Sequence, residues 1–221
     1  MEEHIVKILE VEELTHDVRK IVTEKPDNYT FEPGQATEVA ISRPGMEEER
    51  RPFTFTSLND ENHLEFIIKV YHTEGVTDVI GELEVGEKLV IHDVWGAIEY
   101  KGPGYFLAGG AGITPFLAIL RQLNKENAVD GNKLFFSNKT EKDIILKDEI
   151  LEMMGDNASF ILSRDKSDKY ISGHIDKEFL KKNIADFNSY FYICGTPDMT
   201  KQLIHDLKSL GVSEEQMIYE K

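Results

Sequence analysis

Short runs in which apolar and polar residues alternate fill the first hundred residues of the chain, and Val, Ile, Phe and Thr are frequent in them. A period of two is typical of strands with one buried face, and these residue types favour strands. Turn-forming segments such as Pro26–Asn28 and Pro33–Gly34 separate the runs, and a brief helix is expected near Val76–Leu83. The expected strands are His4–Val11, Val18–Thr23, Ala36–Ser42, His63–Tyr71 and Lys88–His92. Short strands at this spacing predict a sandwich or a small barrel.

The pattern changes after the turn at Lys101–Gly104, where short apolar runs begin to alternate with segments of helical period. The expected strands are Tyr105–Ala108, Lys133–Ser137, Ser159–Ser163 and Tyr190–Cys194, and the expected helices are Pro115–Asn124, Leu146–Met154, Lys177–Asn183 and Pro197–Leu210. Alternation of strand and helix indicates βαβ units and a parallel sheet. We therefore predict two domains, an all-β domain over residues 1–101 and an α/β domain over residues 102–221.

The segment Tyr105–Leu123 reads as a buried strand, a glycine turn and a helix. The glycines of Gly109–Gly112 permit positive φ and close backbone approach, Thr114 suits an N-cap, and Pro115 suits the first helical position. Free N–H groups and the positive dipole end of such a helix form a seat for a phosphate. Glycines between a strand and a helix can equally well serve packing alone. The turn also departs from the full dinucleotide fingerprint, since Pro115 stands where that motif has its third glycine.

Charge and composition exclude several classes of protein. With 41 acidic and 25 basic residues the chain has a net charge of −16, which argues against binding to nucleic acid or to anionic lipid. The single cysteine excludes a disulfide framework and a cysteine-rich metal site, and the seven histidines show no metal-ligand spacing. The start Met-Glu-Glu-His lacks a signal-peptide profile, and the longest uncharged run, Gly102–Leu120, fits a strand and a helix better than a membrane span. We therefore expect a cytoplasmic protein.

The loops that leave the carboxyl ends of the parallel strands are the expected ligand sites of the second domain. In the loop after the third strand, the candidates for a phosphate are Ser163, Arg164, Lys169 and Tyr170. A solvated basic loop is the alternative, since Asp165 and Asp168 lie among the cations. After the second strand, Ser137–Lys139 offers no acid for a ribose 2′-hydroxyl, which favours NADP over NAD.

Three further stretches carry candidate chemistry. Arg51–Ser57 combines an arginine, aromatics and hydroxyls that could clamp a phosphate and pack on a flat heterocycle, although an ordinary strand with a surface arginine is the simpler interpretation. The amides of Val76 and Thr77, at the start of the brief helix, could bind a second negative group. Cys194 ends the last expected strand; a lone cysteine is usually a small buried hydrophobe, but this position favours ligand contact.

Four of these stretches together resemble the ferredoxin–NADP reductase superfamily over nearly the whole chain. Arg51–Thr54 is similar to the flavin motif Arg-x-Tyr-Ser/Thr, and the run through Ser57 is especially like that of cytochrome b5 reductases. Gly75–Thr77 resembles the pyrophosphate-binding turn, and Gly109–Pro115 resembles the nicotinamide-nucleotide loop. Cys194–Pro197 is similar to the family's Cys-Gly-x-Pro.

The resemblance implies an FAD-binding antiparallel β-barrel followed by an NAD(P)-binding domain, with hydride transfer from the nicotinamide to flavin N5. Carried over by position, Arg51 would hold the FAD phosphates, Phe53 would pack on the isoalloxazine and Thr54 would hydrogen-bond near N5. The residues implied to bind FAD are Arg51, Pro52, Phe53, Thr54, Ile68, Lys69, Val70, Gly75, Val76 and Thr77. Those implied for the dinucleotide are Gly110, Ala111, Gly112, Ile113, Thr114, Ser163, Arg164, Lys169, Tyr170, Gly195 and Pro197. The implied catalytic residues are Thr54, Cys194 and Glu220, with Cys194 beside the nicotinamide C4.

The chain departs from the family pattern at three places. Phe53 replaces the usual tyrosine, Asp93–Gly96 stands where the family has Gly-Pro-x-Gly, and no aromatic follows Glu220. The predicted function is an FAD-dependent NAD(P)H oxidoreductase, with NADPH favoured and an unknown acceptor, either a small molecule or a redox protein. The alternative is a flavin-binding electron-transfer subunit that is active only within a larger complex. An acidic ferredoxin or flavodoxin would be a poor partner for a chain of charge −16.

Overall fold

The computed structural model describes residues 2–71, 75–96, 98–166 and 168–220. It divides into two compact units, residues 1–96 and residues 97–221. The first unit is built on an antiparallel sheet and the second on a parallel sheet with helices, so the expected two-domain fold is confirmed. The division comes slightly before the predicted boundary, because the ring of Tyr100 stacks on that of Tyr192 in the second unit, with centroids 5.7 Å apart.

The described residues of the first unit form six strands and one short helix. They are β1 (His4–Thr15), β2 (Val18–Glu24), β3 (Ala36–Ile41), β4 (Arg51–Thr54), β5 (His63–Lys69), α1 (Val76–Ile80) and β6 (Lys88–Trp95). The strand order is β4-β3-β6-β1-β2-β5, and all neighbours run antiparallel. β1 continues beyond the expected Val11 because Thr15 pairs with Val18 across a tight hairpin, and β6 continues because Trp95 pairs with Ala36.

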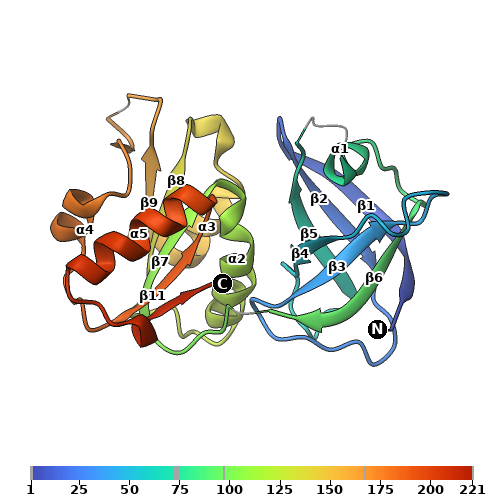
Figure 1. Cartoon of the computed structure of the whole chain (residues 1–221), viewed down its shortest axis with the longest axis horizontal. Helices are drawn as coiled ribbons and strands as arrows, with labels where there is room; N and C mark the ends of the chain where they lie inside the picture. The colour runs from blue at the N-terminus through green and yellow to red at the C-terminus, as the bar shows by residue number, and fades with distance from the viewer. Residues whose placement is uncertain (1, 72–74, 97, 167, 221) are drawn as a thin grey trace. The chain divides into compact units, whose positions relative to one another are not determined.

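The inward residues of these strands form one apolar core. Phe55 is fully buried at its centre, and its ring stacks on that of Phe31 at a centroid distance of 4.2 Å. Val76 and Ile80, on one face of α1, close the core at the end of the sheet where α1 lies in Figure 1. Since α1 has only five residues, this burial, rather than its own hydrogen bonds, holds it in place.

The second unit alternates strands and helices. Its strands are β7 (Gly104–Gly109), β8 (Lys133–Asn138), β9 (Ala158–Leu162), β10 (Ile171–Ser172), β11 (Tyr190–Cys194) and β12 (Met217–Tyr219). Its helices are α2 (Thr114–Lys125), α3 (Lys147–Met154), α4 (Lys177–Asn183) and α5 (Pro197–Ser209), with 3₁₀ turns η1 (Gly110–Ile113), η2 (Glu141–Asp143), η3 (Gly155–Asn157) and η4 (Glu214–Gln216). The strand order is β10-β9-β8-β7-β11-β12, all parallel.

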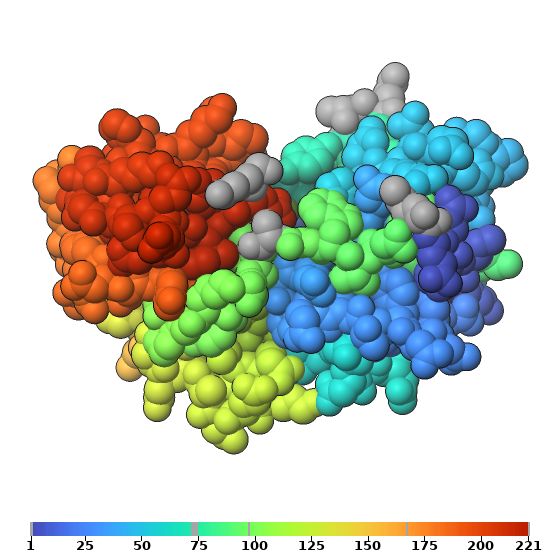
Figure 2. Space-filling model, turned by 60° about the horizontal axis from the view of Figure 1, so that its bottom comes forward, coloured from blue at the N-terminus to red at the C-terminus, as the bar shows by residue number. Residues whose placement is uncertain are grey.

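Helices cover both faces of this sheet, as a buried parallel sheet requires. α4 and α5 cover one face, where Phe179 and Leu203 pack on the side chains of β7, β8 and β11 (Figure 1). α2 covers the other face, where the ring of Phe116 meets that of Phe106 edge to face at 5.1 Å. The residues of α5 and of the segment after it, red in Figure 2, form part of the visible surface of this unit. The two short edge strands β10 and β12 are absent from the sequence-based prediction, since two or three residues carry no readable period.

Two features are absent from the described part of the chain. None of its helices combines the length and apolarity that a membrane crossing requires. Within the same residues, no group of three or more His, Cys, Asp and Glu side chains is placed to hold a metal ion.

A buried tyrosine hydroxyl organises the turn that leads into β7. The hydroxyl of Tyr192 accepts hydrogen bonds from the amides of Lys101 (2.9 Å) and Gly102 (3.0 Å) and donates one to the carbonyl of Gly102 (2.7 Å). Burial raises the pKa of Tyr192 to about 12, so the hydroxyl keeps its proton at any physiological pH. The chain therefore enters the parallel sheet on a turn held by β11.

Replacing Tyr192 with Phe is expected to lower the free energy of unfolding by about 1–3 kcal/mol, because three backbone groups of the turn lose their hydrogen-bond partner. Tyr190→Phe is the matched control on the same strand, at a half-buried position, and should change the free energy by less than about 0.5 kcal/mol. Urea unfolding of the two variants measures the difference. Equal effects would show that the Tyr192 hydroxyl does not hold the turn.

Candidate functional site

The first candidate site lies where the two edge strands of the first unit separate. β4 and β5 are the outer strands of the sheet. They approach each other through a bridge between Phe55 and Phe66 and a hydrogen bond from the Thr56 amide to the Glu65 carbonyl (2.9 Å). Further along, the described residues of β4 and β5 make no strand pairing with each other. The barrel is therefore open along β4, where backbone groups can meet a ligand.

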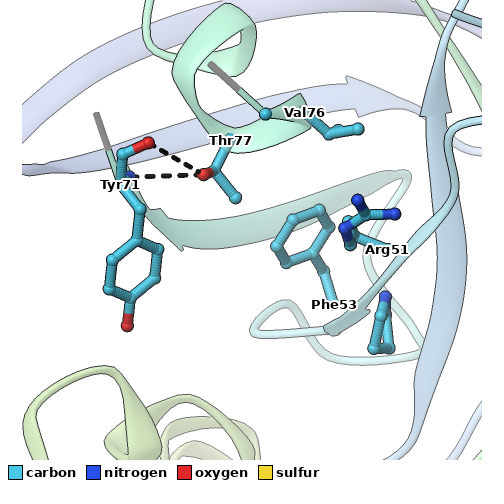
Figure 3. A pocket seen from close by; sticks show the side chains of 7 residues that line it. Arg51, Phe53, Tyr71, Val76 and Thr77 are labelled. Carbon is cyan, nitrogen blue, oxygen red and sulfur yellow. Dashed lines mark hydrogen bonds between the residues drawn. The ribbon is translucent and has the colours of Figure 1, made fainter. Parts of the chain in front are cut away.

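A pocket of about 410 Å³ occupies the side of β4 that faces α1. Arg51 and Phe53 reach from β4 toward the first turn of α1, as Figure 3 shows. The hydroxyl of Thr77 accepts a hydrogen bond from the Tyr71 amide (3.2 Å) and ties the end of β5 to α1. A cation, an aromatic face and the amino end of a helix thus line one cavity.

Arg51 is the positive charge of this pocket. Its side chain is about half exposed, donates to the carbonyl of Arg50 (2.6 Å) and lies 3.6 Å from the carboxylate of Glu49. An exposed ion pair of this kind contributes little, so the guanidinium can exchange it for a phosphate at small cost. Among the described residues, no side chain caps the amino end of α1. The amide of Asp78 donates to the carbonyl of Gly75 (3.0 Å), so the amides of Val76 and Thr77 are the ones that a ligand could meet.

Most of the residues that the sequence assigned to FAD lie together. The pocket is lined by Arg51, Pro52, Phe53, Tyr71, Gly75, Val76 and Thr77, six of which were predicted. Tyr71 was not predicted. The sequence signal for Tyr71 is an aromatic residue at the end of a strand. In the structure Tyr71 is 52% exposed, although an aromatic side chain is normally buried.

The other predicted FAD residues are not part of the pocket lining. Thr54 lies at the end of β4, while Ile68 and Val70 are buried in or beside β5. Lys69 turns its ammonium to Asp17 (2.5 Å), and the amide of Val70 is bonded to the Asp17 carbonyl (2.8 Å). For these four residues, contact with a flavin stays a prediction.

The second candidate site lies at the carboxyl ends of β7 and β11, where the strand order reverses. From β7 the chain proceeds to β8, β9 and β10 on one side of the sheet and then returns to β11 and β12 on the other. Such a reversal leaves a crevice for ligands in open α/β sheets. The glycine turn η1 follows β7 there, and the turn that contains Gly195 and Pro197 follows β11.

The two turns are in close contact, and glycine is what permits it. A Cβ atom on Gly112 would lie 2.3 Å from the carbonyl oxygen of Cys194, and one on Gly109 would lie 2.3 Å from the sulfur of Met199. Gly110 adopts φ +53° with open space around its Cα, so it is free to face a ligand. Met199, in the first turn of α5, was not predicted as part of this site.

The prediction for Thr114 is wrong in one respect. Thr114 does not cap α2 but lies within the helical path, with φ −58° and ψ −46°. The 3₁₀ turn of Gly110–Ile113 runs directly into α2, so the hydroxyl of Thr114 donates to the carbonyl of Ala111 (3.0 Å) instead of accepting from the helix. The free amides of this helical start therefore belong to the glycine turn itself.

Cys194 ends β11 as a half-buried thiol. Burial raises its pKa to about 12, and the negative charge of Glu220 adds to the shift. The parallel pairing of Ile193 with Tyr219 brings Glu220 to this end of the sheet. A thiol that stays neutral can pack against a ligand ring but is a poor nucleophile. Lys221 lies outside the described residues.

The loop from Ser163 to Tyr170 lies beside the loop that leaves β8. The amides of Ser163 and Arg164 donate to the carbonyls of Asn138 (3.0 Å) and Lys139 (2.9 Å). Arg164 and Lys169 are exposed, while the hydroxyl of Tyr170 donates to Glu141 (2.5 Å). The four residues predicted for a phosphate thus lie in one loop at the carboxyl edge, but Tyr170 already has an acidic partner.

Comparison with known proteins gives the same two-part division. The sequence matches the oxidoreductase FAD-binding domain family over residues 5–100 and the oxidoreductase NAD-binding domain family over residues 106–204. It is 31% identical to NADH–cytochrome b5 reductase 1 of Arabidopsis thaliana, over 95% of this chain and 80% of the relative. It is 26% identical to the reductase component of propane 2-monooxygenase of Rhodococcus jostii, over 97% of this chain and 62% of the relative.

The fold has close counterparts among solved structures. A ferredoxin NADP⁺ reductase from Neisseria gonorrhoeae, with FAD and NADP bound, superposes with a TM-score of 0.88 at 21% identity, covering all of this chain and 98% of that one. The chain spans about three fifths of the length of the propane 2-monooxygenase reductase components that it matches.

Gly112→Ala is expected to lower the free energy of unfolding by about 1–3 kcal/mol and to weaken dinucleotide binding about tenfold or more, because the new methyl group separates the two turns. Gly104→Ala is the matched control, since its Cβ would lie 2.2 Å from the Tyr190 carbonyl at the opposite end of the same strands. It should destabilise similarly without a selective loss of binding. Calorimetric titration with NADH and NADPH tests this, and equal loss in both variants would contradict it.

Alkylation of Cys194, the only cysteine, should accelerate with pH and reach no plateau below about pH 10, because its thiolate forms only as the pH approaches about 12. In urea the plateau should move to the ordinary pKa of 9.0. Since the folded pKa is the higher one, this group's contribution to stability is complete below pH 9 and is lost as the pH rises toward 12. Iodoacetamide labelling followed by mass spectrometry measures the profile. A plateau below pH 9 in the folded protein would contradict the neutral-thiol assignment.

Proposed function

Because the chain belongs to the ferredoxin–NADP reductase superfamily, we propose that it is an FAD-dependent oxidoreductase which takes electrons from NAD(P)H and passes them to an acceptor. The observation that carries this proposal is the pocket of the first unit, where Arg51, Phe53 and the start of α1 line one cavity beside an open barrel edge. Arg51 could pair with the phosphates of a flavin nucleotide, and Phe53 could pack on its ring. The unpaired backbone of the barrel edge could form hydrogen bonds with it.

The residues of the first unit fit FAD in defined roles. Arg51 and the amides of Val76 and Thr77 would bind the pyrophosphate, and Phe53 would pack against the isoalloxazine. Phe53 lacks the hydroxyl of the family's tyrosine, so it offers packing without a hydrogen bond. Bound FAD would supply the redox chemistry, accepting a hydride equivalent from reduced nicotinamide and releasing electrons singly or in pairs. Thr54 would donate a hydrogen bond from its hydroxyl near the flavin ring. Ile68, Lys69 and Val70 would contact the flavin through backbone groups.

The residues of the second unit fit a nicotinamide dinucleotide. The turn of Gly110–Thr114 would bind the pyrophosphate, with the turn of Gly195 and Pro197 closing the crevice. Cys194 would pack beside the nicotinamide as a neutral thiol, and Glu220 would stand near it. Arg164 and Lys169, exposed at the neighbouring loop, support NADPH, whereas the Arabidopsis relative is named an NADH enzyme. We propose that both nucleotides react, with NADPH favoured.

The acceptor is constrained by charge. Residues 1–96 contain 22 acidic and nine basic side chains, a net charge of −13 out of the −16 of the chain. An acidic redox protein would be repelled by this unit, so we propose a small molecule or a neutral or basic protein as acceptor. A subunit role in a larger complex is the second candidate. Relatives named reductase components, which are longer than this chain, favour it. A cytoplasmic location stays a prediction.

The decisive experiment is anaerobic titration of the FAD-reconstituted protein with NADPH and NADH, followed by absorbance near 450 nm. Bleaching of a yellow protein supports the proposed oxidoreductase, and a screen of small-molecule and protein acceptors then separates the two candidates. A protein that takes up no FAD would end both. A yellow protein inert to both nucleotides would leave the subunit role as the better account.

Arg51→Ala should weaken FAD binding about tenfold to a hundredfold, because a charge-assisted contact to phosphate is lost. Arg43→Ala is the matched control, since Arg43 is paired with Glu87 in the same unit and does not line the pocket. Fluorescence titration of FAD into each apoprotein measures the affinity. Retention of FAD equal to that of the wild type would remove Arg51 from the site.

A further inference from the structure

Three side chains join the segment that follows β8 to the loop after β9, which holds Arg164 and Lys169, the residues that support NADPH under the proposed function. The hydroxyl of Tyr170 donates to the carboxylate of Glu141 (2.5 Å), and the ammonium of Lys147 donates to the same oxygen (3.1 Å). Lys147 also lies 3.2 Å from the Tyr170 hydroxyl. We call Glu141, Lys147 and Tyr170 the Glu141 cluster. Tyr170 comes from the loop after β9, and the other two residues come from η2 and the start of α3, which follow β8.

The backbone around the Glu141 cluster is bonded on both sides, so its position is well determined. The amide of Glu141 donates to the carboxylate of Asp165 (2.9 Å), and the amide of Arg164 donates to the carbonyl of Lys139 (2.9 Å). The ring of Tyr170 packs edge to face on that of Phe160, at 6.2 Å. These contacts hold Glu141 within the same corner of the sheet as Ser163, Arg164 and Tyr170.

Glu141 is charged and accessible in this arrangement. Hydrogen bonds from Tyr170 first and Lys147 second hold the pKa of Glu141 below its ordinary value. The hydrogen bonds of Lys147 to Glu141 first and Tyr170 second raise the pKa of Lys147. The side chain of Glu141 is 46% exposed and that of Lys147 is 28% exposed, so a ligand can reach both. At neutral pH Glu141 is therefore a carboxylate. It accepts the only hydrogen bond that the Tyr170 hydroxyl can donate, and it neutralises the positive charge of Lys147.

We propose that Glu141 is a specificity-determining residue, which disfavours the 2′-phosphate of NADPH and supports the 2′-hydroxyl of NADH. A 2′-phosphate needs donors and positive charge, and Glu141 withholds both Tyr170 and Lys147 from it while adding a negative charge. A ribose hydroxyl can instead donate to the carboxylate. This inference rests on the proposed function, and within it Glu141 opposes Arg164 and Lys169.

The sequence alone predicted a preference for NADP at this position. Ser137–Lys139 contains no acid at the end of the second strand, and this absence favoured NADP. In the structure the chain turns through η2 directly after β8, and the capping box of Thr140 and Asp143 fixes that turn. Glu141 reaches the corner from within the turn, where it takes the place of the missing acid.

Glu141→Gln is the test, because glutamine keeps the size of the side chain and an oxygen acceptor for Tyr170 while removing the charge. The ratio of kcat/KM for NADPH to that for NADH should rise about 5- to 20-fold, mainly through a lower KM for NADPH, with kcat nearly unchanged. Glu152→Gln removes an exposed carboxylate from α3 and should leave the ratio unchanged. Glu141→Asp keeps the charge and should stay within about twofold of the wild type.

A binding measurement that needs neither FAD nor an acceptor separates this inference from the proposed function. Adenosine 2′,5′-bisphosphate and 5′-AMP are titrated into the wild type and Glu141→Gln by calorimetry. A selective gain of about 5- to 20-fold for the bisphosphate in the variant supports the inference. An unchanged ratio, or a rise as large in Glu141→Asp as in Glu141→Gln, overturns it while leaving the nucleotide site in place. Binding of neither adenylate to the wild type overturns the inference together with the proposed nucleotide site.

Discussion

The close approach of two backbone turns is the constraint on which the second unit's site depends. β7 and β11 are neighbours in a parallel sheet, so their carboxyl ends come out side by side and the chain must turn in a small space. The hypothetical Cβ of Gly112, 2.3 Å from the Cys194 carbonyl, shows that no side chain fits between the turns. Because η1 then continues directly into α2, the backbone amides of the glycine turn stay at the crevice.

A different constraint produces the pocket of the first unit. There the decisive feature is a missing contact, because the outer strands β4 and β5 meet near Phe55 and Phe66 and are not paired beyond this point in the described residues. The buried cluster around Phe55 holds the strands together at one end. α1, anchored by Val76 and Ile80, then faces β4 across a cavity. Buried packing at one end and an open edge at the other leave a pocket beside β4.

Charge is distributed unevenly between and within these sites. The pocket of the first unit presents Arg51 in a unit with a net charge of −13, so the cation stands out against an acidic surface. At the sheet edge of the second unit, Cys194 is kept neutral by burial, whereas the Glu141 cluster keeps a carboxylate charged by pairing it. Under the proposed function, Cys194 would contact the nicotinamide end of the dinucleotide and the Glu141 cluster its adenosine end. The first contact would be neutral, and the second would include a charged carboxylate.

Local sequence patterns were sufficient to predict most of the helices and strands and their order, because alternation, helical period, glycine and proline act over a few residues. α4 and β11 have the predicted bounds, and Arg51, Phe53 and Gly75–Thr77 could be assigned to one site through their resemblance to known motifs. Which of these residues contact one another could be seen only in the folded chain. Tyr71, Met199 and Glu141 depend on contacts between segments distant in sequence, and Thr114 failed as a cap because η1 and α2 join. Such contacts arise from packing and charge in three dimensions, which no local pattern records.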